Sequence, residues 1–220
     1  MKKNYSDFFM VLLIVPAFLL SCNSYRGKPF TGAPQEIPGK VQCEFYDLGG
    51  EDVAYHDTDS INNGSGRLNP VNGNPLHEFR IDEGVDISYT KTNGTDDNPY
   101  NDVMPEINQL YVGWTEPGEW IKYSVNVKET GDYTIGLMYT CNGDGGIEVL
   151  THDNVSSGLM PVKSTHKDAD TVAWRQWHHW NKNDLLGKIH LKEGLQVITL
   201  KTVKNGNMNY DYLEFKKRDE

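Results

Sequence analysis

The sequence has few cysteines and few basic residues. Cysteine occurs only at Cys22, Cys43 and Cys141. An exported protein permits a disulfide between the last two, and two separate buried thiols are the alternative, because a body of this size does not need the bond. Lys and Arg number 21 against 31 Asp and Glu, for a formal charge of −10. This charge argues against a protein that tracks nucleic-acid phosphates, since such binding depends on Lys and Arg.

The length and the apolar content indicate one folded body. The chain has 220 residues, which suffices for one domain with a sizeable core and excludes a large multidomain enzyme. Hydrophobic residues make up 37%, and there are 5 Trp, 12 Tyr and 7 Phe. That content of core-forming residues excludes a disordered chain.

The one long apolar run lies near the start of the sequence. Phe8–Leu20 follows Lys2 and Lys3 and ends in Leu-Leu-Ser-Cys22. A membrane-spanning helix needs about 20 apolar residues, so this run is too short and is typical of a signal peptide. Its end resembles a bacterial lipobox, which implies that residues 1–21 are removed and that Cys22 is lipidated. The lipid would hold the protein on a bacterial membrane, at the outer membrane or the cell surface; an ordinary signal peptide is the alternative.

Residues 22–40 contain the lipidated cysteine and a stretch rich in Pro and Gly. Its apolar residues do not recur with the period of a strand (2 residues) or of a helix (3.6 residues), so the stretch is predicted to be a flexible tether. Residues 41–217 are predicted to form the folded module, and 218–220 a short tail.

Alternating apolar residues recur through the module. They occur at Ile121/Tyr123/Val125/Val127, Tyr133/Ile135/Leu137/Tyr139, Ile198/Leu200 and Leu213/Phe215. Asn, Asp and Gly clusters that suit tight turns separate these runs. No amphipathic helix and no internal repeat is apparent, so the fold class is predicted to be all-β, an antiparallel β-sandwich of the jelly-roll type.

Two tryptophans have no obvious strand to support. Trp114 precedes the turn Glu116-Pro117-Gly118, and Trp174 lies in a polar stretch. Exposed aromatic rings near Asn or Asp suit sugar binding, because the C–H face of a pyranose packs on a ring while its hydroxyls bond to amides or carboxylates. Core packing is the alternative for aromatic residues, and it is expected for Trp120 and Tyr123.

Several motifs along the chain resemble family 6 carbohydrate-binding modules. In order, they are Val41-Gln-Cys-Glu-Phe-Tyr-Asp, Gly50-Glu-Asp-Val-Ala-Tyr-His-Asp, Val112-Gly-Trp-Thr, Gly118-Glu-Trp-Ile-Lys-Tyr-Ser-Val, Trp174-Arg-Gln-Trp177 and Asn209-Tyr-Asp-Tyr-Leu-Glu-Phe. The resemblance runs from Val41 to about Lys216. It implies a β-sandwich jelly roll that binds sugars in the loops at one end.

The resemblance assigns the sugar-binding residues by position. It places two clamping aromatic rings at Trp114 and Trp174 and the hydroxyl-binding amide at Asn209. Ser88 falls where the family commonly has an acidic residue, so a sugar preference that relies on that carboxylate does not transfer. The stretch Thr90–Gln109 is longer than in the family and contains Tyr100, which we expect to wall or narrow the cleft; Ser65–Glu78 is also extended.

The resemblance further implies a structural calcium ion near the first and last strands. Its matching positions are Gln42, Glu44 and Asp211, which come together if the terminal strands pair. Calcium prefers six to eight oxygen ligands, and the alternative is an ordinary polar edge strand. Alternate residues of an extended strand face the same side, so the side chains of Gln42 and Glu44 would lie on one face.

Histidine motifs at Tyr55-His56-Asp57 and Trp177-His-His-Trp180 do not indicate a zinc or catalytic site. Zinc needs three or four converging ligands, and His178 and His179 would face opposite ways in an extended chain. The sequence also has no Gly-x-Ser-x-Gly nucleophile motif. These features favour a non-catalytic module.

The function predicted from the sequence is polysaccharide or oligosaccharide binding by a membrane-tethered module. Such a module would recruit glycan to partner glycoside hydrolases and uptake proteins. Two alternatives remain: a glycan-active hydrolase or lyase on a similar sandwich, and a cell-envelope adhesion module that does not bind sugar.

Overall fold

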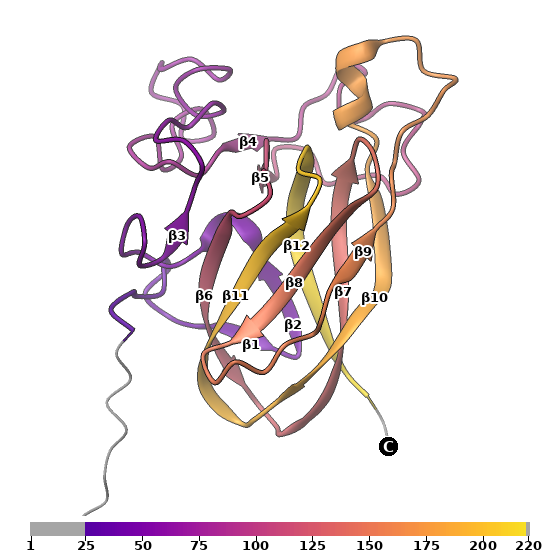
Figure 1. Ribbon diagram of the computed structural model, residues 1–220. Coiled ribbons are helices and arrows are strands. Elements are labelled where there is room, and N and C mark those ends of the chain that lie inside the picture. The colour runs from indigo at the N-terminus through magenta and orange to yellow at the C-terminus, as the bar shows by residue number, and fades with distance from the viewer. Residues whose placement is uncertain (1–24, 219–220) are drawn as a thin grey trace, which may run out of the picture.

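The structure is a sandwich of two β-sheets, seen in the computed structural model, which describes residues 25–218 (Figure 1). The first sheet has the strand order β1-β6-β11-β8-β9, and β3 also pairs with β6. Its strands are β1 (Gln35–Ile37), β3 (Tyr55–His56), β6 (Trp120–Val127), β8 (Gly145–Thr151), β9 (Met160–Val162) and β11 (Gly194–Lys204). All pairings are antiparallel except that of β1 with β6, which is parallel.

The second sheet has the order β10-β7-β12-β5-β4, and β2 also pairs with β12. Its strands are β2 (Gly39–Gln42), β4 (Ile87–Tyr89), β5 (Leu110–Val112), β7 (Gly131–Cys141), β10 (Asn181–Leu191) and β12 (Met208–Lys217). Two short 3-10 helices complete the described part of the chain, η1 (Cys43–Phe45) and η2 (Ala173–Trp177). The predicted all-β antiparallel sandwich is therefore confirmed.

The core forms where the inward faces of the two sheets meet. Along β6 every second residue is buried, and Ile121, Tyr123, Val125 and Val127 point inward as their alternation predicts. Most buried apolar residues of β7, β11 and β12 belong to the same cluster, and Met138 of β7 packs in a second, smaller cluster with Tyr111 and Trp180. Cys43 and Cys141 are both buried and free, so they are two separate thiols.

Residues 22–40 were predicted to be a flexible tether, but the part that the structure describes, from Tyr25 onward, packs against the sandwich. Residues 35–37 form β1 beside β6, and β2 begins at Gly39 and pairs with β12. Ile37 and Val41 are fully buried, and Lys28 bridges to Leu48. Strands of three and four residues are too short to give a period in the sequence, which is why this segment resembled a linker.

The signal peptide and the lipidated Cys22 lie outside the described residues. Within 25–218, no helix has both the length and the apolar character that crossing a membrane requires.

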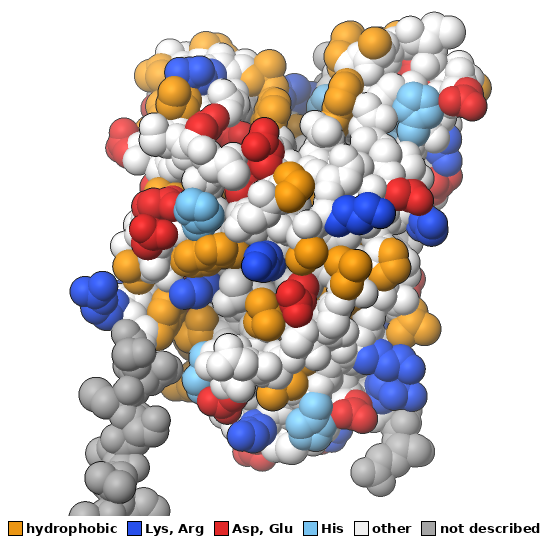
Figure 2. All heavy atoms as spheres, in the orientation of Figure 1, with side chains coloured by type: hydrophobic (Ala, Val, Ile, Leu, Met, Phe, Trp, Pro, Cys, Tyr) orange, Lys and Arg blue, Asp and Glu red, His pale blue; other side chains and the backbone are white. Residues whose placement is uncertain are grey.

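Long loops gather at one end of the sandwich. The loop after β3 lies at the upper left of Figure 1, and the loop that contains η2 rises at the upper right. Between these two loop regions the surface is hollowed, as Figure 2 shows from the same side.

Candidate functional site

A cavity of about 420 Å³ lies among the loops at this end of the sandwich. Its lining residues are Leu68, Tyr111, Trp114, Trp174, Trp177, His178, Asn207 and Asn209. We call this cavity the tryptophan cleft. Its lining contains three indole rings and two amides but no Asp, Glu, Lys or Arg, so the walls present flat apolar faces and neutral hydrogen-bonding groups.

Trp114 lies two residues after the end of β5 and is 41% exposed. Its backbone has a φ of +49°, a conformation that is uncommon for a bulky residue and is found where surrounding contacts enforce it. The enforcing contacts lie on both sides: Gly113 N donates to Asp86 O, and Asn207 N donates to Thr115 O. The loop thus holds the indole at the cleft with much of its surface open to a ligand.

Gly206 allows the loop that carries Trp114 to pack against the turn before β12. A Cβ atom at position 206 would overlap the backbone carbonyl of Thr115. Gly206→Ala is expected to destabilise the fold by about 1–3 kcal/mol and to weaken glycan binding, because the two backbones must move apart. Thermal melting and glycan titration check this.

Gly187→Ala serves as the matched control. There the added methyl group would meet only the flexible side chain of Met160. Glycan affinity should stay at the wild-type value in this variant. A Gly206→Ala protein with unchanged affinity and melting temperature would contradict the packing argument.

Trp174 and Trp177 lie on η2 and line the same cleft. Residues three apart in a 3-10 helix are eclipsed, so both rings occupy one side of η2. Trp174 is 55% exposed, the larger exposed fraction of the two. Trp177 was quoted in the family motif but was not predicted to bind sugar, although its spacing from Trp174 contained that signal.

A buried ion-pair network holds η2 in place. Asp170 accepts hydrogen bonds from Arg175 Nε and Nη2 at 2.6 and 2.7 Å, and it lies 2.8 Å from His179 Nε2. The Arg175 guanidinium keeps the pKa of Asp170 well below its usual range. Since both carboxylate oxygens are occupied, the loop that presents Trp174 is fixed before any ligand arrives.

Asn209 connects the sheet to η2. Its Nδ2 donates to Trp177 O at 2.7 Å, and the same carbonyl accepts from Thr140 Oγ1 at 2.8 Å. Within residues 25–218, no hydrogen bond uses Asn209 Oδ1, which lies close to Gly113. Asn209 therefore both anchors η2 and offers an acceptor at the cleft.

The structure brings Trp114, Trp174 and Asn209 together and leaves the other two predicted sugar contacts outside the cleft. Ser88 in β4 is fully buried, and its Oγ accepts from Asn69 Nδ2 and Lys91 Nζ, each at 3.1 Å. Tyr100 Oη donates to Ala169 O at 3.2 Å. Tyr100 thus bonds to the loop that leads into η2, and neither residue lines the cavity.

The remaining lining residues were not predicted from the sequence. They are Leu68, Tyr111, Trp177, His178 and Asn207. Leu68 comes from the extended loop Ser65–Glu78, which was recognised as an insertion without a place in the fold. Only the tertiary structure shows that Leu68 lines the same cavity as the tryptophans of η2.

The three predicted calcium ligands also lie together. Gln42 ends β2, Glu44 lies in η1, and Asp211 lies in β12, which pairs with β2. Each has a buried side-chain oxygen without a hydrogen-bond partner: Gln42 Oε1, Glu44 Oε2 and Asp211 Oδ1. Burial and the nearby Asp211 charge raise the pKa of Glu44 to about 8, and burial raises the pKa of Asp211 to about 7. Unpartnered buried oxygens of this kind fit a hard cation.

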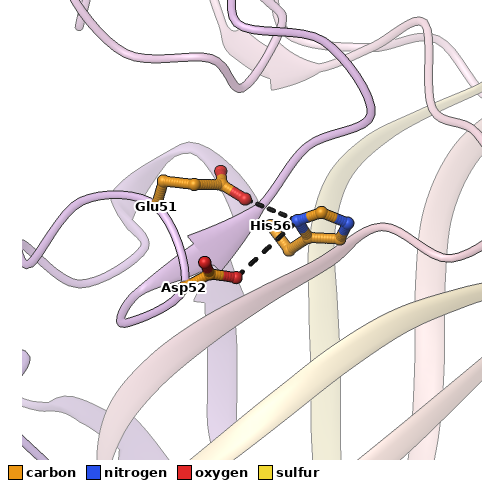
Figure 3. A group of neighbouring side chains, drawn as sticks. All are labelled: Glu51, Asp52 and His56. Carbon is orange, nitrogen blue, oxygen red and sulfur yellow. Dashed lines mark hydrogen bonds and ion pairs between the residues drawn. The ribbon is translucent and has the colours of Figure 1, made fainter.

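A third group of side chains surrounds His56 at the edge of the first sheet (Figure 3). His56 Nδ1 bonds to Glu51 Oε1 and lies 4.0 Å from Asp52 Oδ1. The Glu51 hydrogen bond raises the pKa of His56. Both carboxylates are exposed, so an ordinary surface ion pair accounts for the group.

Comparison with known proteins identifies a family for most of this chain. The family model described as carbohydrate binding module (family 6) matches residues 85–217. A module from Clostridium stercorarium, solved in complex with cellobiose, has a TM-score of 0.50 and 14% identity over 85% of this chain and 99% of that one. This similarity supports the sandwich fold.

Two further solved structures are similar at lower scores. A β-1,3-glucan binding module from Bacillus halodurans has a TM-score of 0.48 and 16% identity, covering 84% of this chain and 99% of its own. A module of Cellvibrio mixtus lichenase 5A, in complex with cellotriose, has a TM-score of 0.45 and 18% identity, covering 62% and 88%.

Proposed function

The chain belongs to carbohydrate-binding module family 6, and we propose that it binds an oligosaccharide or polysaccharide in the tryptophan cleft. The observation that carries this proposal is the convergence of Trp114, Trp174 and Trp177 with Asn209 around one cavity. An indole packs against the C–H face of a sugar ring, while the amide bonds to hydroxyl groups. Fixing η2 and Trp114 beforehand lowers the entropy lost on binding.

The first ligands to test are β-linked glucans. Related modules were solved with cellobiose and cellotriose, and one relative binds β-1,3-glucan. We therefore propose a screen of residues 25–220 against soluble and insoluble glucans and other plant and algal polysaccharides. Retention of one of them above background supports the proposal, and binding to none of them contradicts it.

We infer that binding is not coupled to catalysis. The cleft lining has no carboxylate pair, which glycoside hydrolysis by the common mechanisms requires. Release of new reducing ends or of unsaturated sugar would contradict this inference, so both are measured in the same wells as binding.

We also propose that calcium binds between Gln42, Glu44 and Asp211. The support is the set of three buried oxygens without partners, together with carboxyl groups whose pKa is raised by burial. A bound cation would compensate those buried charges and join β2 and η1 to β12. Its role would be structural, since these residues lie outside the tryptophan cleft.

For the cell, we propose that Cys22 carries a lipid and that the module concentrates glycan near hydrolases and uptake proteins. The support is the lipobox-like sequence that ends at Cys22. Expression of the full chain in a bacterium with an outer membrane should place it in the membrane fraction. Cys22→Ser should abolish lipid incorporation.

A further inference from the structure

The motif Trp177-His-His-Trp180 links the tryptophan cleft to two buried carboxylates. His178 Nδ1 lies 2.8 Å from Asp96 Oδ1, whereas His179 Nε2 lies 2.8 Å from Asp170 Oδ2. The two rings therefore bond to different buried carboxylates, and His178 lies at the C-terminal cap of η2 rather than in an extended chain. His179 is fully buried, while His178 lines the cleft.

Asp96 is a fully buried carboxylate with several donors around it. Besides His178, Trp180 Nε1 donates to Oδ1 at 2.7 Å, and Lys91 N donates to Oδ2 at 2.7 Å. An ionised carboxylate only accepts hydrogen bonds, so in the neutral form of the His178 ring the proton must lie on Nδ1. Nε2 of the same ring then presents a lone pair.

The orientation of the His178 ring turns Nε2 away from Asp96. The side chain is 15% exposed, and its ring meets the Trp174 ring edge-on with centroids 5.8 Å apart. Among residues 25–218, no hydrogen bond uses Nε2. The lone pair is thus open beside the tryptophan on which a sugar would stack.

We propose that His178 Nε2 accepts a hydrogen bond from a hydroxyl group of an uncharged sugar in the tryptophan cleft, and that Asp96 is the positioning residue that fixes the ring. This inference rests on the proposed carbohydrate binding. Sugar hydroxyls are donors, and a fixed acceptor discriminates among hydroxyl configurations. The cleft lining offers no Lys or Arg to a charged sugar, which restricts the ligand to uncharged units.

The test compares two replacements of His178. His178→Phe keeps an aromatic ring without an acceptor, and His178→Gln keeps an acceptor oxygen. With cellotriose and the β-1,3-linked glucose trisaccharide as probes, His178→Phe should weaken binding by roughly three- to tenfold, the effect of one lost neutral hydrogen bond. His178→Gln should retain more affinity than His178→Phe. His190→Ala is the control, because His190 is exposed and pairs with Asp132 on the strands β10 and β7.

A second measurement does not depend on a ligand. The ¹⁵N shifts of the His178 ring should report the Nδ1–H form at pH 8. The Nε2–H form, or wild-type affinity in folded His178→Phe, would overturn the inference while leaving carbohydrate binding intact. If the wild-type protein binds neither trisaccharide nor any screened glycan, the proposed function fails and this inference fails with it.

Discussion

Replacing Trp174 with alanine is expected to weaken glycan binding by roughly five- to 150-fold, on the order of 1–3 kcal/mol. Trp174 has the most exposed indole of the tryptophan cleft, at 55%. It also lies on a loop fixed by the Asp170 network, so its stacking surface is already in place when the ligand arrives. Titration calorimetry with the glycan retained in the screen measures the loss.

Two control variants separate stacking from general damage. Trp174→Phe keeps an aromatic face and should retain part of the affinity. Leu195→Ala removes an exposed apolar side chain at the start of β11, outside the cleft lining, and should leave affinity unchanged. Unchanged affinity in a folded Trp174→Ala protein would show that the sugar binds elsewhere.

Without calcium, the protein is expected to become less stable as the pH rises from about 4.5 to about 8. Glu44 has an ordinary pKa of 4.5 that burial raises to about 8, and Asp211 has an ordinary pKa of 3.8 that burial raises to about 7. The folded state therefore binds protons more tightly than the unfolded state. The stability that this provides is fully present below the unfolded pKa and is lost as the pH passes through the folded values.

Calcium should reverse this loss. A cation compensates the ionised carboxylates, so its stabilising effect should be small near pH 4.5 and large at pH 8. At a calcium concentration 100 times the Kd, linkage adds about 2.7 kcal/mol to the free energy of unfolding. Urea unfolding at several pH values, with calcium or with a chelator, measures both effects.

Glu44→Gln is the decisive variant for the calcium proposal. It removes one buried charge, so the chelated protein should be more stable than the wild type at pH 8, while the response to calcium should fall. Glu51→Gln removes an exposed carboxylate and should leave the calcium response as in the wild type. Equal stability of the wild-type protein with calcium and with chelator at pH 8 would contradict the proposal.

The fold was predictable because its core strands are long enough to show a pattern. Along β6 the alternation extends over all eight residues and the buried positions agree with it, whereas in β7 every residue from Ile135 to Cys141 is buried. The short strand β1 and the first two residues of β2 were missed, because they had been assigned to the tether. The strands β1 and β2 each contribute one buried side chain, and their pairing energy comes from partners far along the chain rather than from local sequence.

The sequence by itself determined the sandwich and the residue types at its ligand-binding end, because alternation and motif order are local properties of the chain. Only the tertiary structure decided which of those residues meet. In the structure, Leu68 and His178 line the cleft. Ser88 is fully buried, and Tyr100 bonds to the loop that leads into η2 without lining the cleft. The physical reason is that contacts absent from the local sequence position the loop side chains. Asp96 bonds to His178, which is more than 70 residues away along the chain, and Asp170 bonds to Arg175 within one loop.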